Sequence, residues 1–348
     1  MKIDYLIIGQ GLAGSLLAWE LIQRQKKVII IDNNQLNASL VAAGLINPVT
    51  GMRFVKSAAV DQLLPTAINY YQQLTEYFNQ PFYIEKPMLR LLKNQKQLMA
   101  CRKRFKDPAY HDYLEKIIPS FPKIESTVGI LKQNKTAYLL TQPLLSSLKD
   151  YFIRLNVYIK AEIHYQEIKL SPSLQWKNIQ PSQIIFCEGH LATNNPWFSA
   201  LPFQLVKGEI ITATAGQNIQ QNILNYGHWF IPLDSKTFRT GASFDRENIN
   251  TTTTSTAKKM LLDSLKQVYP TLTIEQITNH QAGIRPTTLD KMPFVGTHPY
   301  YPELVIFNGF GAKGSLQIPW HCSQLADNLI NNKPLSQTSD IHRYHSLF

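Results

Sequence analysis

The sequence predicts an α/β fold, and three neighbouring segments at its N-terminus carry that prediction. Residues 3–8 (IDYLII) and 28–31 (VIII) are short apolar runs, typical of buried parallel strands. Residues 12–24 lie between them and repeat apolar side chains at helical spacing. A strand, a helix and a second strand in this order predict a parallel βαβ unit.

A glycine-rich turn, Gly9-Gln10-Gly11-Leu12-Ala13-Gly14, joins the first strand to the helix. Gly9 permits the tight turn, Gly11 lets the backbone approach a pyrophosphate, and Gly14 lets helix and strand pack closely. The helix N-terminus would offer free N–H groups to the phosphates, and Asp32 at the end of the second strand can accept hydrogen bonds from ribose hydroxyls. This context favours a Rossmann-like dinucleotide site over an unrelated glycine-rich turn, but it does not choose FAD over NAD.

The amino-acid composition excludes several classes of protein. A length of 348 residues suggests two domains, and 44% hydrophobic residues exclude wholesale disorder. Three widely spaced cysteines, Cys101, Cys187 and Cys322, argue against a disulfide framework or a cysteine-based zinc site, so no metal is expected. Residues 1–22 resemble a signal peptide, but Asp4, Glu20 and the spaced glycines interrupt them. Without an apolar run of about 20 residues we expect no membrane span and a cytoplasmic protein.

Two later segments have the small residues that a bound ring system needs. Ala42-Ala43-Gly44, followed by Asn47-Pro48, would let backbone lie flat against a ring, although a simple turn and strand would look the same. Near the C-terminus, Gly309, Gly311 and Gly314 loosen the chain before a helix expected at 319–330. A phosphate-binding loop of the Walker type is excluded here, because the Lys precedes the last Gly.

Taken in order along the chain, these segments resemble the D-amino-acid oxidase family of FAD-dependent oxidoreductases, which includes glycine oxidase and sarcosine oxidase. The matching pieces cover nearly the whole chain: the N-terminal turn, AAGLINP, IIFCEGHLA (184–192), KGEI (207–210), WFIPL (229–233), TGASFDREN (240–248), the stretch from AGIRP to PFVG (282–296), and NGFGAKG. The resemblance implies FAD as cofactor and a discontinuous FAD domain at 1–81, 136–202 and 279–348. It implies an antiparallel-sheet substrate domain at 82–135 and 203–278.

The resemblance also assigns residues to the cofactor. It adds Ala42, Ala43, Gly44, Cys187, Gly189, Gly309, Gly311, Ala312, Lys313, Gly314 and Ser315 to the N-terminal residues Gly9, Gly11, Leu12, Ala13, Gly14 and Asp32. The loop and helix N-terminus at 309–315 would face the flavin's pyrimidine edge, where reduction leaves negative charge. Lys313 would add to that stabilisation, or would be a solvated loop lysine. For Cys187 a buried small side chain is preferred to a redox role.

For the substrate, the resemblance places Arg285 opposite a carboxylate, which its guanidinium fork suits; the alternative is an Arg that stabilises the turn before Pro286. Trp229 stands where glycine oxidase-like members have Tyr, which puts simple glycine specificity in doubt. Trp229, Arg285 and Lys313 are the candidate catalytic residues, and Asn47, Phe244 and His228 the candidate pocket residues. Phe244 and Trp229 could equally be core aromatics, and His228 a hydrogen-bonded rim residue. The implied reaction is hydride transfer from the C–N carbon of a small amine or amino acid to flavin N5.

A basic segment raises an alternative substrate. Residues 86–106 are rich in Lys and Arg and contain no acid, and they hold much of the net charge of +11. Lys86, Arg90, Lys93 and Lys96 recur as along a helix face, either a solvated one or one that follows phosphates. A relative in the resembled family oxidises the carboxymethylaminomethyl group of a tRNA wobble uridine, so tRNA is the alternative partner. An NAD-dependent dehydrogenase and a non-catalytic cofactor protein stay open as other classes, and the oligomeric state is not predicted.

Overall fold

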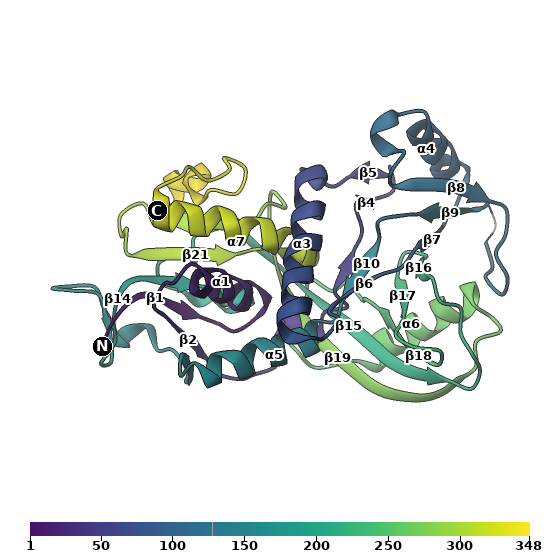
Figure 1. Cartoon of the computed structure of the whole chain (residues 1–348). Coiled ribbons are helices and arrows are strands. Elements are labelled where there is room, and N and C mark those ends of the chain that lie inside the picture. Colours follow the sequence, from purple (N-terminus) through teal and green to yellow (C-terminus); the bar gives the residue numbers. More distant parts are fainter. Residues whose placement is uncertain (127) are drawn as a thin grey trace.

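A six-stranded sheet and an eight-stranded sheet stand side by side, with one long helix between them (Figure 1). The computed structural model describes residues 1–126 and 128–348. The six-stranded sheet has the order β11-β2-β1-β14-β21-β20. Its strands are β1 (Lys2–Ile8), β2 (Val28–Asp32), β11 (Tyr158–Lys160), β14 (Gln180–Phe186), β20 (Phe294–Thr297) and β21 (Leu304–Asn308). All neighbours are parallel except β20 and β21, which are antiparallel.

The eight-stranded sheet has the order β19-β15-β18-β17-β16-β7-β9-β8 and is antiparallel except for the parallel pair β16 and β7. Its strands are β7 (Met88–Leu91), β8 (Leu114–Ile118), β9 (Ile130–Gln133), β15 (Phe203–Ala215), β16 (Ile223–Asn225), β17 (Trp229–Pro232), β18 (Thr237–Gly241) and β19 (Ile274–Thr288). The long antiparallel pair β15 and β19 runs from beside the six-stranded sheet into the eight-stranded one (Figure 1).

Four helices surround the parallel strands or link the two sheets: α1 (Leu12–Gln23), α3 (Val60–Phe78), α5 (Thr141–Arg154) and α7 (Gly314–Asn331). Helix α7 packs against α1 and α3, and α3 stands between the sheets (Figure 1). Helices α4 (Gln95–Phe105) and α6 (Ser255–Val268) flank the eight-stranded sheet (Figure 1).

Short elements complete the chain. They are α2 (Ala38–Val41), β3 (Leu45–Ile46), β4 (Val49–Thr50), β5 (Val55–Lys56), β6 (Tyr83–Glu85), β10 (Ala137–Leu139), β12 (Ile168–Lys169) and β13 (Gln175–Trp176). The described residues also form the 3-10 turns η1 (Pro108–Tyr110), η2 (Tyr165–Glu167), η3 (Gly189–Asn194), η4 (Gly311–Lys313) and η5 (Ile341–Leu347). Strands β4 and β5 form a hairpin, and β3, β10 and β6 form a small antiparallel sheet.

The predicted βαβ unit is confirmed as β1, α1 and β2, with ends within one or two residues of those expected. The predicted mixed fold is confirmed as well, with the parallel sheet and the mostly antiparallel one in separate halves. The strands of the six-stranded sheet fall inside the ranges expected for the FAD domain, while β19 crosses the expected boundary at 279. No helix among the described residues is long and apolar enough to cross a membrane.

Two predicted elements were wrong. The C-terminal helix begins at Gly314 rather than at 319, because Pro319 lies inside it instead of at its start. The carbonyl that Pro319 would leave unpaired, that of Ser315, accepts a hydrogen bond from the Tyr71 hydroxyl over 2.8 Å. Residues 88–91 form the buried strand β7, so the basic residues from Lys86 to Lys96 do not share a helix face. Only Arg90 lies in that strand, and Lys96 belongs to α4, which begins at Gln95.

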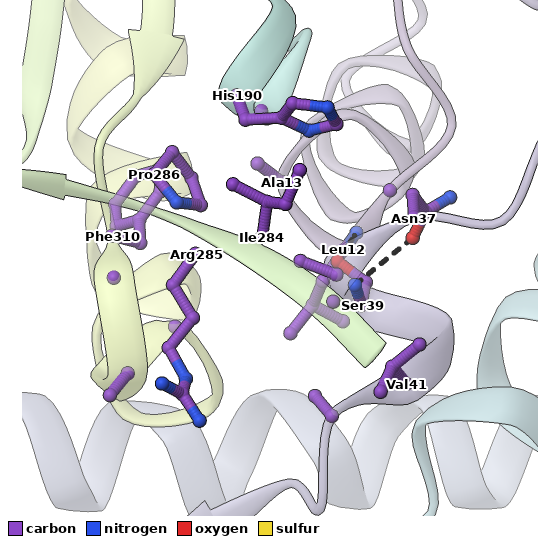
Figure 2. A pocket seen from close by; sticks show the side chains of 18 of the residues that line it. Leu12, Ala13, Asn37, Ser39, Val41, His190, Ile284, Arg285, Pro286 and Phe310 are labelled. Atoms are coloured by element: carbon purple, nitrogen blue, oxygen red, sulfur yellow. Dashed lines mark hydrogen bonds between the residues drawn. The ribbon is translucent and has the colours of Figure 1, made fainter. Parts of the chain in front are cut away.

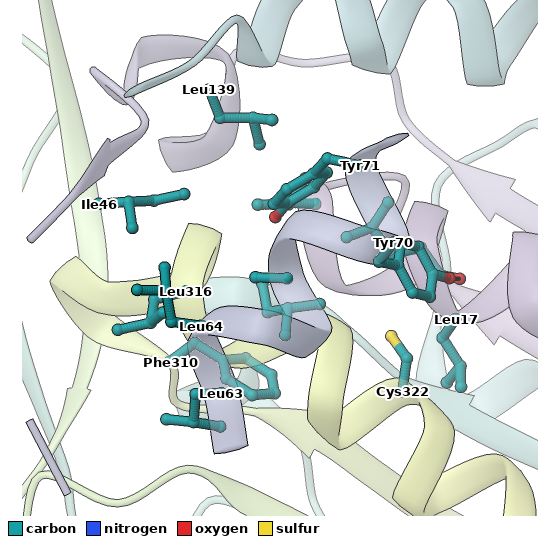
Figure 3. Close-up of a cluster of buried hydrophobic side chains, with 14 of the residues drawn as sticks. Leu17, Ile46, Leu63, Leu64, Tyr70, Tyr71, Leu139, Phe310, Leu316 and Cys322 are labelled. Carbon is teal, nitrogen blue, oxygen red and sulfur yellow. Dashed lines mark hydrogen bonds between the residues drawn. The ribbon is translucent and has the colours of Figure 1, made fainter. Parts of the chain in front are cut away.

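The largest hydrophobic core joins α1, α3 and α7 (Figure 3). Leu17 comes from α1, Leu64 and Tyr71 from α3, and Leu316 and Cys322 from α7. Each is at most 3% exposed, and full burial of one such aliphatic side chain stabilises the fold by about 1.5–3 kcal/mol. This core fixes α7, and with it the glycine-rich loop that precedes the helix, against the N-terminal unit.

Candidate functional site

One large cavity, of about 1070 Å³, opens where the carboxyl ends of β1, β2, β14 and β21 meet the inner face of the eight-stranded sheet. Ligands of open α/β sheets bind at the carboxyl ends of the strands. Figure 2 shows part of the wall, with Leu12 and Ala13 of α1, Ser39 and Val41 of α2, and the β19 segment 284–286. The cavity therefore lies between the two halves of the molecule and takes walls from both.

The glycine turn after β1 has the tight geometry that its sequence predicts. Gly9 has a φ of +102°, and a Cβ there would lie 2.5 Å from the carbonyl oxygen of Cys187. A Cβ on Gly14 would overlap the carbonyl oxygen of Gly9. Gly14 does not line the cavity, whereas Gly9 and Gly11 do, so Gly14 serves packing and the other two leave room at the wall.

The N-terminus of α1 opens into the cavity. Its capping residue, Gly11, has no side chain to occupy the first N–H groups, and Leu12 donates its N–H to Ser39 Oγ over 3.0 Å. Leu12 and Ala13 line the wall, so backbone N–H groups and the positive end of the helix dipole face the space. Ser39 is itself held by Asn37, whose side chain accepts hydrogen bonds from the N–H groups of Ser39 and Leu40 (Figure 2).

Asp32 lines the cavity at the end of β2. Its two carboxylate oxygens accept hydrogen bonds from the N–H groups of Gln10, at 2.8 Å, and Asn34, at 2.6 Å. The carboxylate is thus fixed beside the glycine turn, where its remaining lone pairs can accept from ribose hydroxyls.

The small residues after α2 form another part of the wall. Ala42, Ala43 and Gly44 all line the cavity. Gly44 has a φ of +69°, and a Cβ there would overlap the backbone of Leu139. Arg239 of β18 holds this segment by donating to the carbonyl oxygens of Val41 and Ala42, over 2.5 and 2.9 Å.

A second helix N-terminus reaches the same cavity from the C-terminal segment. Gly311, Ala312, Lys313, Gly314 and Ser315 line it, and α7 begins there with no side-chain cap. Gly309 does not line the cavity; it has a φ of +82° and packs against Thr288 and Phe294. Asn308 connects this loop to the one after β14 by donating to the carbonyl oxygen of Gly189 over 2.9 Å.

Lys313 is half-buried in the wall and donates to Ser57 Oγ over 3.1 Å. Burial, together with the nearby Lys291, lowers the pKa of its ammonium. It is therefore not the solvated loop lysine of the alternative interpretation, and its charge lies at the cavity beside the N-terminus of α7.

Arg285 projects into the cavity from β19 (Figure 2). Its guanidinium lies against Gly208 of β15, where any Cβ would overlap it. Burial lowers the pKa of Arg285. Among the described residues no hydrogen-bond or ion-pair partner takes up this guanidinium, so its fork is available to an anion.

The structure brings most of the remaining predicted residues together and leaves two outside. Trp229 of β17 and Asn47 line the cavity. His228 does not: its Nδ1 lies 3.2 Å from the carbonyl oxygen of Ala242, and burial lowers its pKa. Phe244 does not either: its ring is 66% exposed and lies beside Arg246.

Several residues of the cavity wall were not predicted from the sequence. Glu188 follows β14 and lines the cavity; it accepts hydrogen bonds from the Tyr165 hydroxyl at 2.8 Å and from Asn195 Nδ2 at 2.9 Å. Burial raises its pKa to about 7. Cys187 beside it is buried, which raises the pKa of its thiol, so it is a small apolar wall residue. Asn37 and Ser39 could have been found as a helix-capping pair; Glu188 and Arg90 gave no local signal.

These features fit an extended dinucleotide with a flat ring system. Two uncapped helix N-termini suit anionic groups, Asp32 suits a ribose, and the small residues at 42–44 leave room at the wall. Within residues 1–126 and 128–348 no group of three or more His, Cys, Asp or Glu side chains could hold a metal ion.

Comparison with known proteins agrees with this assignment. The family model described as FAD dependent oxidoreductase matches residues 4–328. Glycine oxidase from Pseudomonas putida is 22% identical over 366 aligned positions, which cover 96% of each chain. A tRNA 5-methylaminomethyl-2-thiouridine biosynthesis bifunctional protein from Legionella pneumophila is 25% identical over 185 positions, 45% of this chain and 28% of that protein.

Among solved structures, glycine oxidase from Geobacillus kaustophilus superposes with a TM-score of 0.83 at 17% identity, covering 99% of this chain and 98% of that one. That likeness shows the shared fold. The family match spans most of the sequence, so the chain belongs to the FAD-dependent oxidoreductase family that the sequence resembled, and FAD is its cofactor.

Proposed function

We propose that this family member oxidises the C–N bond of a small amine or amino acid that carries a carboxylate. The observation that carries the proposal is Arg285: a half-buried guanidinium without an acidic partner among the described residues, in the wall of the cavity that holds the dinucleotide turn. Partial desolvation of a cation is unfavourable unless an anion meets it. A substrate carboxylate supplies that anion and is then fixed at a defined place relative to the cofactor.

Different parts of the cavity wall would bind different parts of FAD. Gly9, Gly11 and the N-terminus of α1 would hold the pyrophosphate, with Asp32 beside the adenosine ribose. Ala42 to Gly44 and the loop 311–315 would enclose the ring system. When bound, FAD supplies the two-electron chemistry by accepting a hydride at N5.

The protein's part in the reaction is positioning and electrostatics. Arg285 binds the carboxylate in a bidentate way and so fixes the carbon next to the amine. The dipole of α7 and the ammonium of Lys313 stabilise negative charge at that end of the cavity. Trp229 takes up space in the pocket on the side of the eight-stranded sheet. Its indole N–H is its only hydrogen-bond donor, so its main role is to shape the pocket and not to bind the carboxylate.

The relatives support this class of substrate, since two proteins named glycine oxidase resemble the chain over almost its full length. The carboxymethylaminomethyl group of a tRNA wobble uridine is the second candidate, because it contains a glycine unit. Two observations favour it: the partial match to the Legionella tRNA-modifying protein, and the exposed basic residues of α4, among them Lys96, Arg102 and Lys103.

Anaerobic reduction of the bound flavin tests the proposal and separates the two candidates. The FAD-loaded protein receives, in turn, glycine, N-methylglycine, proline, D-amino acids, and tRNA bearing the carboxymethylaminomethyl group. Loss of the visible flavin absorbance with a small amine supports the first candidate. Reduction by the tRNA alone favours the second, and flavin that stays oxidised with every compound contradicts both.

A further inference from the structure

A second arginine in the cavity wall lacks an anionic partner. Arg90 lies on β7, is 8% exposed and lines the cavity. Its Nη2 donates to the carbonyl oxygen of Gly51 over 2.6 Å, and its guanidinium carbon lies 4.1 Å from the centroid of the Phe54 ring. Its Nη1 is buried and has no hydrogen-bond partner among the residues that the structure describes.

Nothing within the chain neutralises this charge among the described residues. No carboxylate forms an ion pair with Arg90, and burial lowers its pKa to about 10. The cavity wall does contain acids, Asp32, Glu162 and Glu188, but all three lie at or just after the ends of strands of the six-stranded sheet. The wall supplied by the eight-stranded sheet and the β4–β5 hairpin contains none in the part of the chain that the structure describes.

Arg239 has a purely structural role in the same protein and serves as a comparison for Arg90. It is also buried, which lowers its pKa to about 10, but both of its terminal nitrogens donate to carbonyl oxygens of Val41 and Ala42. It does not line the cavity. Arg90 differs in both respects, since it keeps a free terminal nitrogen and lies in the wall.

Strand register places Arg90 beside other pocket residues. Arg90 pairs with Asn225 of β16, which pairs with Trp229 of β17, and all three line the cavity. The row therefore extends the pocket away from Arg285, across the sheet toward β7. Asn225 adds an amide beside the guanidinium, a combination that suits a carboxylate.

We propose that Arg90 binds a second anionic group of the substrate, so that the preferred amine carries an acidic substituent in addition to the carboxylate held by Arg285. This rests on the proposed function and names its substrate class. Four strand steps of about 4.8 Å, or about 19 Å of backbone, separate β7 from β15, where the Arg285 guanidinium lies. Because the two guanidinium groups come from strands so far apart in the sheet, we expect the acid to lie on a substituent that extends from the reacting centre.

Matched substrates test this in the FAD-loaded protein. One series is N-(ω-carboxyalkyl)glycines of increasing chain length, each beside the N-alkylglycine of the same length. The other is 2-aminodicarboxylic acids beside their uncharged 2-amino acid counterparts, which distinguishes an acid on nitrogen from one on carbon. At one chain length or more, we expect kcat/KM for the diacid to exceed that of its counterpart by about tenfold.

Substitutions of Arg90 then test whether this residue causes the preference for diacids. Arg90→Gln should bring the diacid preference down to near parity, and Arg90→Lys should restore part of it, because Lys keeps the charge without the planar fork. Lys116→Gln, which removes an exposed charge of the same sheet outside the cavity, should leave the preference intact. A wild-type protein without diacid preference at any length overturns the proposal, even when the Arg90 variants fail to fold. A preference that survives in Arg90→Gln overturns it too.

Binding of unreactive analogues separates this proposal from the proposed function. Alkoxyacetates replace the amine nitrogen with an ether oxygen, and their dissociation constants can be measured by calorimetry with and without a terminal carboxylate. Tighter binding of the diacids that depends on Arg90 supports the second anion site, even if no amine reduces the flavin. Equal binding of diacid and monoacid at every length contradicts it, even if amine oxidation is observed.

Discussion

The hydroxyl of Tyr71 donates a 2.8 Å hydrogen bond to the carbonyl oxygen of Ser315. Pro319 has no N–H to give to that carbonyl, so a side chain of α3 replaces a hydrogen bond that α7 cannot make for itself. Because Ser315 also lines the cavity, this bond joins the hydrophobic core to the N-terminus of the helix that opens into the cavity.

Tyr71→Phe should therefore destabilise the protein by about 1–3 kcal/mol, the cost of leaving a buried carbonyl unpaired. Thermal unfolding of the FAD-loaded protein measures this. Tyr77→Phe is the matched control, since Tyr77 is 54% exposed, and it should change little. Equal melting temperatures for Tyr71→Phe and wild type would show that the carbonyl finds another partner.

Gly14→Ala should abolish stable FAD binding, because the added Cβ would overlap the carbonyl oxygen of Gly9 at the turn where we propose that the pyrophosphate binds. Gly216→Ala is the control: its Cβ would meet only Thr273 Cγ2 at 3.9 Å. The measurement is the FAD released per chain after denaturation. Full flavin content in Gly14→Ala would contradict the close packing of α1 on β1.

The sequence predicted those features that neighbouring residues of the chain determine, and it failed where residues distant in the sequence determine the structure. The glycine turn and Asp32 were predicted because each position serves one neighbouring backbone or ligand group. Arg90 was misplaced on a helix face, since its strand is specified by partners from Asn225 and Leu131 that are distant in the sequence. The start of α7 was misplaced because the hydroxyl that compensates for Pro319 comes from α3.

The residues of the candidate site show the same contrast between local and distant determinants. Loop residues such as those at 42–44 and 311–315 line the cavity as the family resemblance implied. Phe244 was assigned by resemblance alone, and its ring is instead exposed outside the cavity. Glu188 could not be predicted as a wall residue, because its surroundings are set by Tyr165 and Asn195 from other segments.

Arg285→Ala should raise KM for a carboxylate-bearing amine by at least about tenfold, or ~1.4 kcal/mol, with the flavin retained. Removing the guanidinium takes away the bidentate partner of the carboxylate and leaves the dinucleotide turn untouched. Steady-state kinetics with the best small amine provide the values. Arg246→Ala removes an exposed arginine outside the cavity and should match wild type; unchanged KM in Arg285→Ala would remove Arg285 from the site.

Glu188 should make stability depend on pH. Burial raises its pKa from 4.5 to about 7, so between these values the folded state holds a proton that the unfolded state has lost. The contribution is fully present below about pH 4.5 and is lost as pH rises through about 7. Relative to Glu188→Gln, the free energy of unfolding of wild type should fall by up to about 3 kcal/mol across this range. Parallel curves for the two proteins would show that the carboxyl ionises freely in the fold.

The visible spectrum of the purified protein, before and after anaerobic addition of a carboxylate-bearing amine, tests the central claim most directly. Amine oxidation at the cavity between the two sheets predicts a flavin spectrum at one FAD per chain, and its bleaching when the amine is added. A colourless protein that takes up no FAD would contradict the account. A fully loaded flavin that every such amine leaves oxidised would contradict it equally.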